Sequence, residues 1–421
     1  MKACFNACAE HDLRLLPFSP CYERDNLEIR AAAYNSGAYG SITFEFYLDD
    51  AKIGESTVAA ESGSYAFAKA QKEMAGLAGE HTVTVKMSSK DGEVINTCMT
   101  KPLTVLKKKK PLLDGGFIMI GPPNDREFCM DYKDDLKNMT DDDWRRYISE
   151  MYKYGQKVII INVACQYLTI ESREIVAHYP SKLHKKSDIK AYDPIEAIFS
   201  EADKNGMEIF LGIGNNYGHM GTPDEVDELL LRYNNHKSFY GWYLAYEHPC
   251  DDDFTADAYK EQMKLARHII KVDPVKPIML SPHGMPADWV LDIFANTPEI
   301  DIFMPQDCVG QSRLDIKGSR EMHEKMYKMC KSSHKHLWAN CESFNINFDV
   351  KRLWPRYKNG GMDGEEGFVQ QIETVTPYTE KTLNFMFTGF FTPPDFEPKI
   401  GCDLAIKQYN EYKAYADKIN K

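Results

Sequence analysis

The hydrophobic pattern of the chain changes once, near residue 110. Before that point, apolar and polar residues alternate with a period of two, and residues 81–87 place Val83, Val85 and Met87 on one face. Residues 41–48 show the same alternation, with four apolar side chains on one face: Ile42, Phe44, Phe46 and Leu48. Turn-forming Asn, Asp, Gly and Ser residues separate the runs. This pattern predicts an antiparallel β-sandwich over residues 1–110.

From Gly115 onward, short apolar runs alternate with stretches of helical periodicity. The candidate strands are Phe117–Ile120, Val158–Val163, Ile209–Ile213, Gly241–Tyr246, Ile278–Ser281, Ile302–Pro305, Leu337–Cys341 and Asn384–Thr388. Thr140 and Thr222 open helices with capping-type starts, and residues 254–272 and 320–332 are amphipathic. Eight such alternations predict a (β/α)8 barrel, or TIM barrel, over residues 111–421. No glycine-rich dinucleotide fingerprint follows the first strand, which argues against an open doubly wound sheet.

Composition narrows the class of partner. The 421 residues are 43% hydrophobic and carry a formal net charge of -12, which argues against a nucleic-acid partner because binding to phosphates needs a basic surface. No apolar run reaches the roughly 18 residues that a membrane span requires. The first residues include no apolar segment typical of a signal peptide. With eleven cysteines and no CxxC pair, a reducing, cytoplasmic environment is favoured, and secretion would require a leader that preceded this chain. The oligomeric state stays open.

Polar and aromatic residues follow nearly every predicted barrel strand. In a parallel barrel these strand ends share one face, where barrel enzymes bind their substrates. Amides and carboxylates suit sugar hydroxyls, which both donate and accept hydrogen bonds. The alternative is that polar loops simply follow strands. The predicted substrate-binding residues are Asn162, Asn215, Asn216, Tyr246, His283, Gln306, Asp307, Trp338 and Asn340.

Two glutamates close apolar runs in the fourth and seventh predicted strands. Glu247 ends the run 241–247 and Glu342 ends the run 336–342. A carboxylate against a core is costly unless it is paired or functional. Paired carboxylates at a barrel mouth indicate glycoside hydrolysis, with Glu247 as acid/base and Glu342 as nucleophile. A retaining mechanism would place the two carboxyls about 5–5.5 Å apart. The alternative is a salt bridge to an inward-facing arginine or lysine.

Two resemblances support these assignments. Tyr34-Asn-Ser-Gly with the segment 46–55 resembles bacterial immunoglobulin-like adhesion modules of the CARDB type, which implies an immunoglobulin-like accessory domain. Residues 241–247, 304–310 and 337–344 resemble bacterial glycoside-hydrolase-like barrels of the clan that carries its acid/base and nucleophile on strands four and seven. The resemblance implies that Gln306 and Asp307 line the −1 subsite.

One position departs from that clan. Many of its members have an asparagine immediately before the acid/base, where it contacts the sugar 2-hydroxyl, but this chain has Tyr246. The departure puts that contact in doubt and keeps open a rival function, a non-catalytic carbohydrate-binding or scaffold barrel. A third option is a barrel that acts on phosphorylated substrates. This chain lacks the glycine-rich phosphate-binding segment that such a barrel is expected to have after strands seven and eight.

Neither a metal nor a cofactor is predicted. The twelve histidines are scattered without an HExxH motif, and Asp251–Asp253 lack the alternating spacing of a calcium loop. His248, beside Glu247, is interpreted as a solvated or capping histidine. The sequence therefore predicts a bacterial hydrolase of carbohydrate metabolism that cleaves an oligo- or polysaccharide and needs no bound ion.

Overall fold

The computed structural model describes residues 11–37, 40–89, 97–121, 133–168, 173–215, 218–347, 352–356 and 367–421. The chain divides into two compact units. One consists of residues 1–109, 229–235 and 263–277, and the other of residues 110–228, 236–262 and 278–421. Because helical segments from the second half of the chain belong to the first unit, the domain boundary between residues 110 and 111 stays a prediction.

The N-terminal segment forms two β-sheets. One is antiparallel and contains β1 (His11–Leu16), β3 (Asn26–Asn35) and β6 (Ser64–Glu73). The other contains, in spatial order, β2 (Cys21–Tyr22), β8 (Thr97–Leu106), β7 (Gly79–Ser89), β4 (Ser41–Leu48) and β5 (Ala51–Ala59). Side chains of both sheets form one hydrophobic cluster. The predicted alternation in β4 is confirmed, since its four apolar side chains are buried and the residues between them are half-buried.

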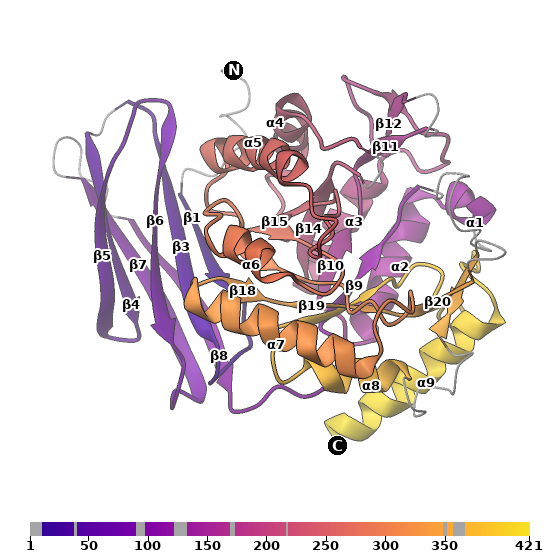
Figure 1. Ribbon diagram of the computed structural model, residues 1–421. Coiled ribbons are helices and arrows are strands. Elements are labelled where there is room, and N and C mark those ends of the chain that lie inside the picture. Colours follow the sequence, from indigo (N-terminus) through magenta and orange to yellow (C-terminus); the bar gives the residue numbers. More distant parts are fainter. Residues whose placement is uncertain are drawn as a thin grey trace. The chain divides into compact units, whose positions relative to one another are not determined.

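The second unit is built round a nine-stranded parallel sheet that curves into a nearly closed barrel (Figure 1). In spatial order the strands are β18 (His336–Leu337), β17 (Ile302–Phe303), β16 (Ile278–Leu280), β15 (Phe239–Leu244), β14 (Glu208–Ile213), β10 (Val158–Ile161), β9 (Gly115–Ile118), β22 (Thr382–Phe385) and β19 (Ala339–Glu342). All eight predicted strands are present, and the buried apolar runs explain why they could be recognised.

The first and last strands of that row are two parts of the seventh predicted strand. Only Trp338 separates β18 from β19. The Trp338 N–H donates to the carbonyl of Phe303 on one side, and the Ala339 N–H donates to the carbonyl of Lys381 on the other. The chain itself therefore joins the two edges of the sheet. The eighth strand was predicted too late: β22 begins at Thr382, and the backbone already turns at residues 387–391.

Helices surround the strands (Figure 1). They are α1 (Lys133–Asn138), α2 (Asp141–Lys153), α3 (Pro194–Asn205), α4 (Pro223–Tyr233), α5 (Ala256–Val272), α6 (Asp288–Ala295), α7 (Ile316–Ser332), α8 (Phe368–Val375) and α9 (Asp403–Asn420). The capping prediction for α2 is confirmed, because Thr140 and Asp143 bond reciprocally. Helix α7 begins four residues before its predicted start, where Asp315 provides the N-cap.

Two β excursions that the sequence pattern did not predict follow barrel strands. After β10, a small sheet contains β11 (Cys165–Tyr167), β12 (Ile175–Ala177) and β13 (Lys185–Lys186). After β19, β20 (Phe344–Asn347) and β21 (Arg352–Pro355) form an antiparallel pair. Both follow the carboxyl ends of their strands, the end at which barrel enzymes bind substrates.

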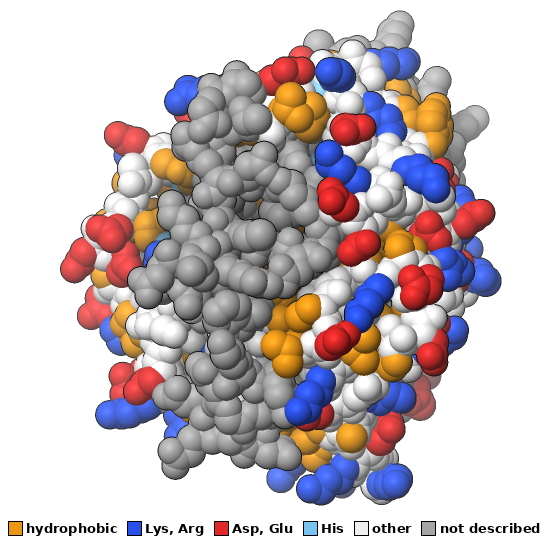
Figure 2. Space-filling view, turned by 90° about the vertical axis from the view of Figure 1, so that its right-hand side faces the viewer, with side chains coloured by type: hydrophobic (Ala, Val, Ile, Leu, Met, Phe, Trp, Pro, Cys, Tyr) orange, Lys and Arg blue, Asp and Glu red, His pale blue; other side chains and the backbone are white. Residues whose placement is uncertain are grey.

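Acidic and basic side chains are interspersed over the described part of the face shown in Figure 2. Within the residues that the structure describes, no helix is both long and apolar enough to cross a membrane.

Candidate active site at the carboxyl ends of the barrel strands

Glu342 is the last residue of β19 and is 1% exposed. Gln311, in the loop after β17, engages both of its carboxylate oxygens: the Gln311 N–H donates to Oε2 at 2.7 Å and Nε2 donates to Oε1 at 2.8 Å. The loop approaches so closely that a Cβ atom at Gly310 would lie 2.4 Å from the Phe344 carbonyl oxygen and 2.7 Å from the Cβ of Glu342. Only glycine fits there without displacing the loop.

Asp307, which is fully buried, supports the same strand end. Its Oδ1 accepts from the backbone N–H of Glu342 at 3.1 Å and from that of Val309 at 3.3 Å. Its Oδ2 accepts from Nε2 of Gln371, in α8, at 2.6 Å. The same Gln371 Nε2 donates to the Glu342 carbonyl oxygen at 3.0 Å. Asp307 and Gln371 thus hold the backbone from which the Glu342 side chain projects.

Burial and mutual repulsion perturb both carboxyl groups. Burial raises the pKa of Glu342, the charge of Asp307 raises it further, and the result is a pKa of about 8. Hydrogen bonds from Gln311 and the charge of Arg356 oppose this increase in the pKa of Glu342. The pKa of Asp307 is also raised, chiefly by burial. Like charges in one buried site cannot both ionise easily, so this pair titrates as a unit.

Glu247 lies three residues after β15 and is half-buried. Its charge acts on Tyr243, a β15 residue whose ring meets Phe117 across the barrel interior at a centroid distance of 5.3 Å. Burial raises the pKa of Tyr243 well above its ordinary value, and the charge of Glu247 raises it further. Hydrogen bonding to Ser281 lowers it. Glu247 therefore lies close enough to Tyr243 for its charge to act on the phenol, at the carboxyl end of β15.

The Ser281 hydroxyl links this region to β19. It accepts from Nδ2 of Asn340 at 3.4 Å, and Asn340 lies two residues before Glu342 on the same strand. The other amide atom, Asn340 Oδ1, is buried without a hydrogen-bond partner among the described residues. A polar chain of Tyr243, Ser281 and Asn340 thus runs from the neighbourhood of Glu247 to the strand that carries Glu342.

Gln306 belongs to the same cluster. It forms an isolated parallel bridge with Asn340, and its Oε1 accepts from Nε2 of Gln311 at 3.3 Å. Four predicted site residues thus form a contiguous set: Gln306, Asp307, Asn340 and Glu342. Ser281 and Tyr243 extend it towards the end of β15, after which Glu247 lies. We call this set, with Gln311, the carboxylate cluster.

Three further predicted residues follow neighbouring strands. Asn162, half-buried, comes directly after β10. Asn215 is buried. Its side-chain Oδ1 accepts from the backbone N–H of His219 at 3.4 Å, and its backbone N–H donates to the His219 carbonyl at 2.6 Å. Tyr246 is half-buried, with its ring 4.9 Å from that of His248. Asn216 lies outside the described residues.

The backbone N–H of His283 donates to the carbonyl of His248, the residue after Glu247, whereas Trp338 points away from the carboxylate cluster. Nδ1 of His283 is 3.0 Å from Nη1 of Arg313, and burial together with that positive charge lowers the His283 pKa to about 4. Trp338 packs edge-on against Phe210 inside the barrel, and its indole N–H donates to Glu380, which precedes β22. Because Glu380 is at the amino ends of the strands, the Trp338 indole points away from the mouth.

Of the two interpretations of His248, solvated or capping, the solvated one is wrong. Its side chain is 1% exposed, and Nε2 lies 2.7 Å from Oε1 of Gln262. Burial lowers the pKa of His248 to about 4. The aromatic rings of Tyr246, Phe254 and Tyr259 surround it and exclude water.

Sequence reasoning missed Gln311, Gln371 and Arg356. Gln371 could have been noticed, because it is a polar residue on the buried face of α8 between Phe368 and Ile372. Gln311 and Arg356 lie in loops, and no local periodicity marks them. A second group that the sequence left scattered, Cys165, His184 and Glu225, meets beside β11 and could hold a metal ion.

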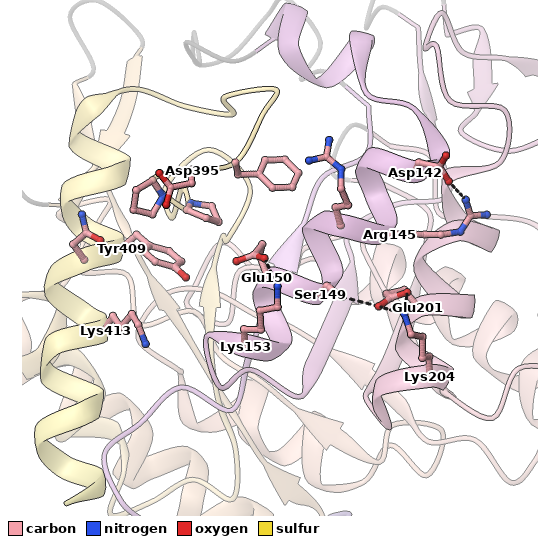
Figure 3. Close-up of a pocket in the computed structure, with 15 residues that line it drawn as sticks. Asp142, Arg145, Ser149, Glu150, Lys153, Glu201, Lys204, Asp395, Tyr409 and Lys413 are labelled. Atoms are coloured by element: carbon pink, nitrogen blue, oxygen red, sulfur yellow. Dashed lines mark hydrogen bonds and ion pairs between the residues drawn. The ribbon is translucent and has the colours of Figure 1, made fainter.

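A surface hollow lies on the outside of the barrel unit (Figure 3). Helices α2, α3 and α9 line it, rather than strand ends. Several of its charges are paired, as Arg145 is with Asp142 at 2.5 Å and Lys204 with Glu201 at 3.3 Å. We assign it no part in the candidate site, because none of the predicted site residues lines it.

The family described as a domain of unknown function, DUF4434, matches residues 113–397, which include every strand of the barrel. The chain belongs to the DUF4434 family. No curated protein sequence matches it significantly. The carboxylate cluster falls wholly within the DUF4434 match.

Solved structures similar to this DUF4434 protein include glycosidases. A protein from Bacteroides thetaiotaomicron VPI-5482, described as a "putative alpha-L-fucosidase", is 17% identical, with a TM-score of 0.54 over 73% of this chain and 95% of that chain. A GH2 β-galacturonidase from Eisenbergiella tayi is 11% identical, with a TM-score of 0.43 over 98% and 72%. The CARDB domain of a Pyrococcus furiosus protein is 11% identical, with a TM-score of 0.20 over 23% and 85%. The first likeness shows a shared fold alone, and the other two scores are too low to support an argument.

Proposed function

We propose that this protein hydrolyses a glycosidic bond of an oligo- or polysaccharide by a retaining mechanism, with Glu247 as acid/base and Glu342 as nucleophile. The observation that carries the proposal is the connection between the two carboxylates. The chain of Tyr243, Ser281 and Asn340 runs from the residue on which the charge of Glu247 acts to the strand that ends in Glu342. A glycosidase needs two carboxyl groups in one such site.

The two glutamates differ in environment, and because the pKa of Glu342 is about 8, its attack requires that its proton be lost first. Half-buried Glu247 would protonate the leaving oxygen and then deprotonate the attacking water. Buried Glu342 would attack the anomeric carbon and form a glycosyl ester, which that water hydrolyses. Two donors from Gln311 favour the ionised form of Glu342 and orient its oxygens.

The remaining polar residues would bind the sugar. The Asn340 Oδ1, buried without a partner among the described residues, supports a contact to a substrate hydroxyl. Gln306 and Tyr246 would line the same subsite, with Asn162 and Asn215 further round the ring of strand ends. We leave Trp338 out of the sugar site because its indole points the other way. The N-terminal sheets would form an immunoglobulin-like accessory domain.

One observation favours a second candidate, a barrel that binds carbohydrate without cleaving it. Both oxygens of Glu342 are already engaged by Gln311, and the loop around Gly310 packs directly on the carboxylate. A nucleophile must reach the anomeric carbon, so catalysis requires this loop to move away from the Glu342 carboxylate. If the loop stays closed, the cluster serves only to shape a binding surface.

A panel of aryl glycosides with good and poor leaving groups tests the proposal. Glu342→Ala should abolish turnover, and added azide should restore it as a glycosyl azide. Glu247→Ala should lower turnover of poor leaving groups by at least about 100-fold and that of good ones much less, because only the former need general acid catalysis. Asp252→Ala is the matched control, since this exposed acid follows the same strand.

Circular dichroism shows whether each variant folds. If Glu342→Ala does not fold, Glu247→Ala, at a half-buried position, still tests the proposal. Sugar binding without turnover, in the wild type and in both variants, would favour the binding barrel. Turnover that survives both substitutions would exclude the proposed roles.

A further inference from the structure

Four side chains with metal-binding atoms meet at a place separate from the carboxylate cluster. Cys165 is in β11, His184 immediately precedes β13, His219 lies in the loop after β14, and Glu225 is in the first turn of α4. Sγ of Cys165, one ring nitrogen of His184 and one carboxylate oxygen of Glu225 all lie within 4.8 Å of one another. Loops that follow two different barrel strands contribute these atoms.

The distances show a convergent arrangement. Nε2 of His184 lies 2.6 Å from Oε1 of Glu225, and Nε2 of His219 lies 2.9 Å from the same oxygen and 3.1 Å from Oε2. The Glu225 and Cys165 side chains are buried, while His184 is partly open to solvent. This set is therefore both enclosed and reachable by an ion.

The position of the Glu225 carboxylate is fixed independently of the histidines. Its Oε2 accepts from the N–H of Thr222 at 2.8 Å, and the Thr222 hydroxyl accepts from the N–H of Glu225 at 3.2 Å. This capping box holds the first turn of α4 in place. With Oε2 anchored to the backbone, Oε1, which faces the two imidazoles, is the oxygen that would bind an ion as His184 turns towards it.

We propose that Cys165, His184 and Glu225 bind a Zn²⁺ ion, or another borderline transition metal, with His219 orienting the Glu225 carboxylate. Thiolate, imidazole and carboxylate are the ligand set of zinc rather than of Ca²⁺ or Mg²⁺, which bind to oxygen. Ligand atoms round one tetrahedral zinc lie roughly 3–4 Å apart, so the His184 and Glu225 atoms need to separate by only about 1 Å.

The metal-free and the metal-bound forms of this cluster differ in where their protons lie. Without a metal, both imidazoles must carry their proton on Nε2 to bond the same carboxylate oxygen, and the thiol of Cys165 takes no part in that arrangement. With the ion, His184 shifts its proton to Nδ1, and Cys165 loses its thiol proton to solvent. Three protein ligands leave one open position, as in zinc sites that bind water.

The surroundings of Cys165 fit that role. Its Sγ lies 3.9 Å from the Tyr179 hydroxyl, and the Tyr179 hydroxyl donates to Glu228, one turn along α4 from Glu225, at 2.9 Å.

Substitution with Co²⁺ gives a direct test on the full-length protein. After treatment with EDTA and buffer exchange, one equivalent of Co²⁺ should produce thiolate-to-metal charge-transfer absorption and the visible bands of tetrahedral Co²⁺. Cys165→Ser should remove the charge-transfer band, and His184→Ala should lower Co²⁺ affinity at least about 10-fold. The measurement needs no substrate, so its outcome is independent of the proposed glycosidase activity.

Cys98→Ser is the matched control, because Cys98 is an exposed free cysteine that lies in the N-terminal sheets. It should bind Co²⁺ like the wild type. Folding of each variant is checked by circular dichroism, and the wild-type titration decides the question if a variant does not fold. Failure of folded wild-type protein to bind Co²⁺ or Zn²⁺ at micromolar concentrations would overturn the proposal, as would a charge-transfer band that persists in Cys165→Ser.

Discussion

The backbone N–H of Glu342 donates to Oδ1 of Asp307 at 3.1 Å, so a fully buried carboxylate holds the strand end that carries a second buried carboxyl group. Two acids in such contact share their titration. The pKa of Glu342 is raised to about 8, first by burial and then by the charge of Asp307. This relationship makes the state of the candidate nucleophile sensitive to pH.

We expect kcat/KM to increase as pH rises through about 8. Glu342 attacks only as the carboxylate, so the pH profile of kcat/KM should have an ascending limb with a midpoint close to the Glu342 pKa of about 8, because that ratio reports groups of the free enzyme. The profile is measured with an aryl glycoside across pH 5 to 10. A profile that is flat between pH 7 and 9 would show that the pair does not control turnover.

Asp307→Asn should move that limb to lower pH. The substitution removes a negative charge that raises the pKa of Glu342, while an asparagine Oδ1 can still accept from the Glu342 N–H. The shift of the midpoint is measured from the pH profile of kcat/KM of the variant. An unchanged or higher midpoint in the folded variant would contradict the electrostatic account. Asp252→Asn, an exposed acid near Glu247, serves as the control and should leave the limb in place.

The stability of the protein should also depend on Glu342. A carboxyl with a folded-state pKa near 8 and an ordinary unfolded value keeps its proton on folding. Between these two values the unfolded chain binds fewer protons, so the free energy of unfolding decreases as pH increases towards 8.

Urea unfolding of the wild type and Glu342→Gln between about pH 6.5 and 8.5 isolates this contribution, because the other titrating groups are common to both. The wild type should lose stability over that interval relative to the variant. Parallel curves for the two proteins would show that Glu342 does not titrate there.

Gln371→Leu should destabilise the protein by about 1–3 kcal/mol, because it leaves the Asp307 carboxylate and the Glu342 carbonyl without their buried donor. Asn410→Leu, at an exposed position of α9, is the control and should cost less than about 0.5 kcal/mol. Chemical denaturation measures both. Equal effects at the two positions would mean that the Gln371 hydrogen bonds contribute little.

The sequence was sufficient to locate the barrel because buried parallel strands read as uninterrupted apolar runs. Residues 158–161 and 239–244 show this, since every side chain in both strands is buried. The strand ends were predicted less well. Trp338 divides the seventh strand, and the eighth begins at Thr382, because hydrogen-bond pairing with neighbouring strands rather than hydrophobicity sets those limits.

The polar contacts of the site depend on tertiary structure that no local pattern encodes. Glu342 could be recognised by its place at the end of a strand, but its partners could not. Gln311 reaches it from the preceding loop, and Gln371 reaches its backbone from α8. In the same way, His184 and Glu225 are far apart in sequence, and only the packing of two loops brings them together.

The most direct test of the central proposal is trapping of the glycosyl-enzyme ester. The protein is incubated with aryl 2-deoxy-2-fluoroglycosides of the sugars that it turns over, and mass spectrometry of its peptides locates any added glycosyl group. We expect a single adduct on Glu342, which should be absent from Glu342→Gln. Turnover accompanied by an adduct on another residue, or by inversion at the anomeric carbon without any adduct, would contradict the assignment of Glu342 as the nucleophile.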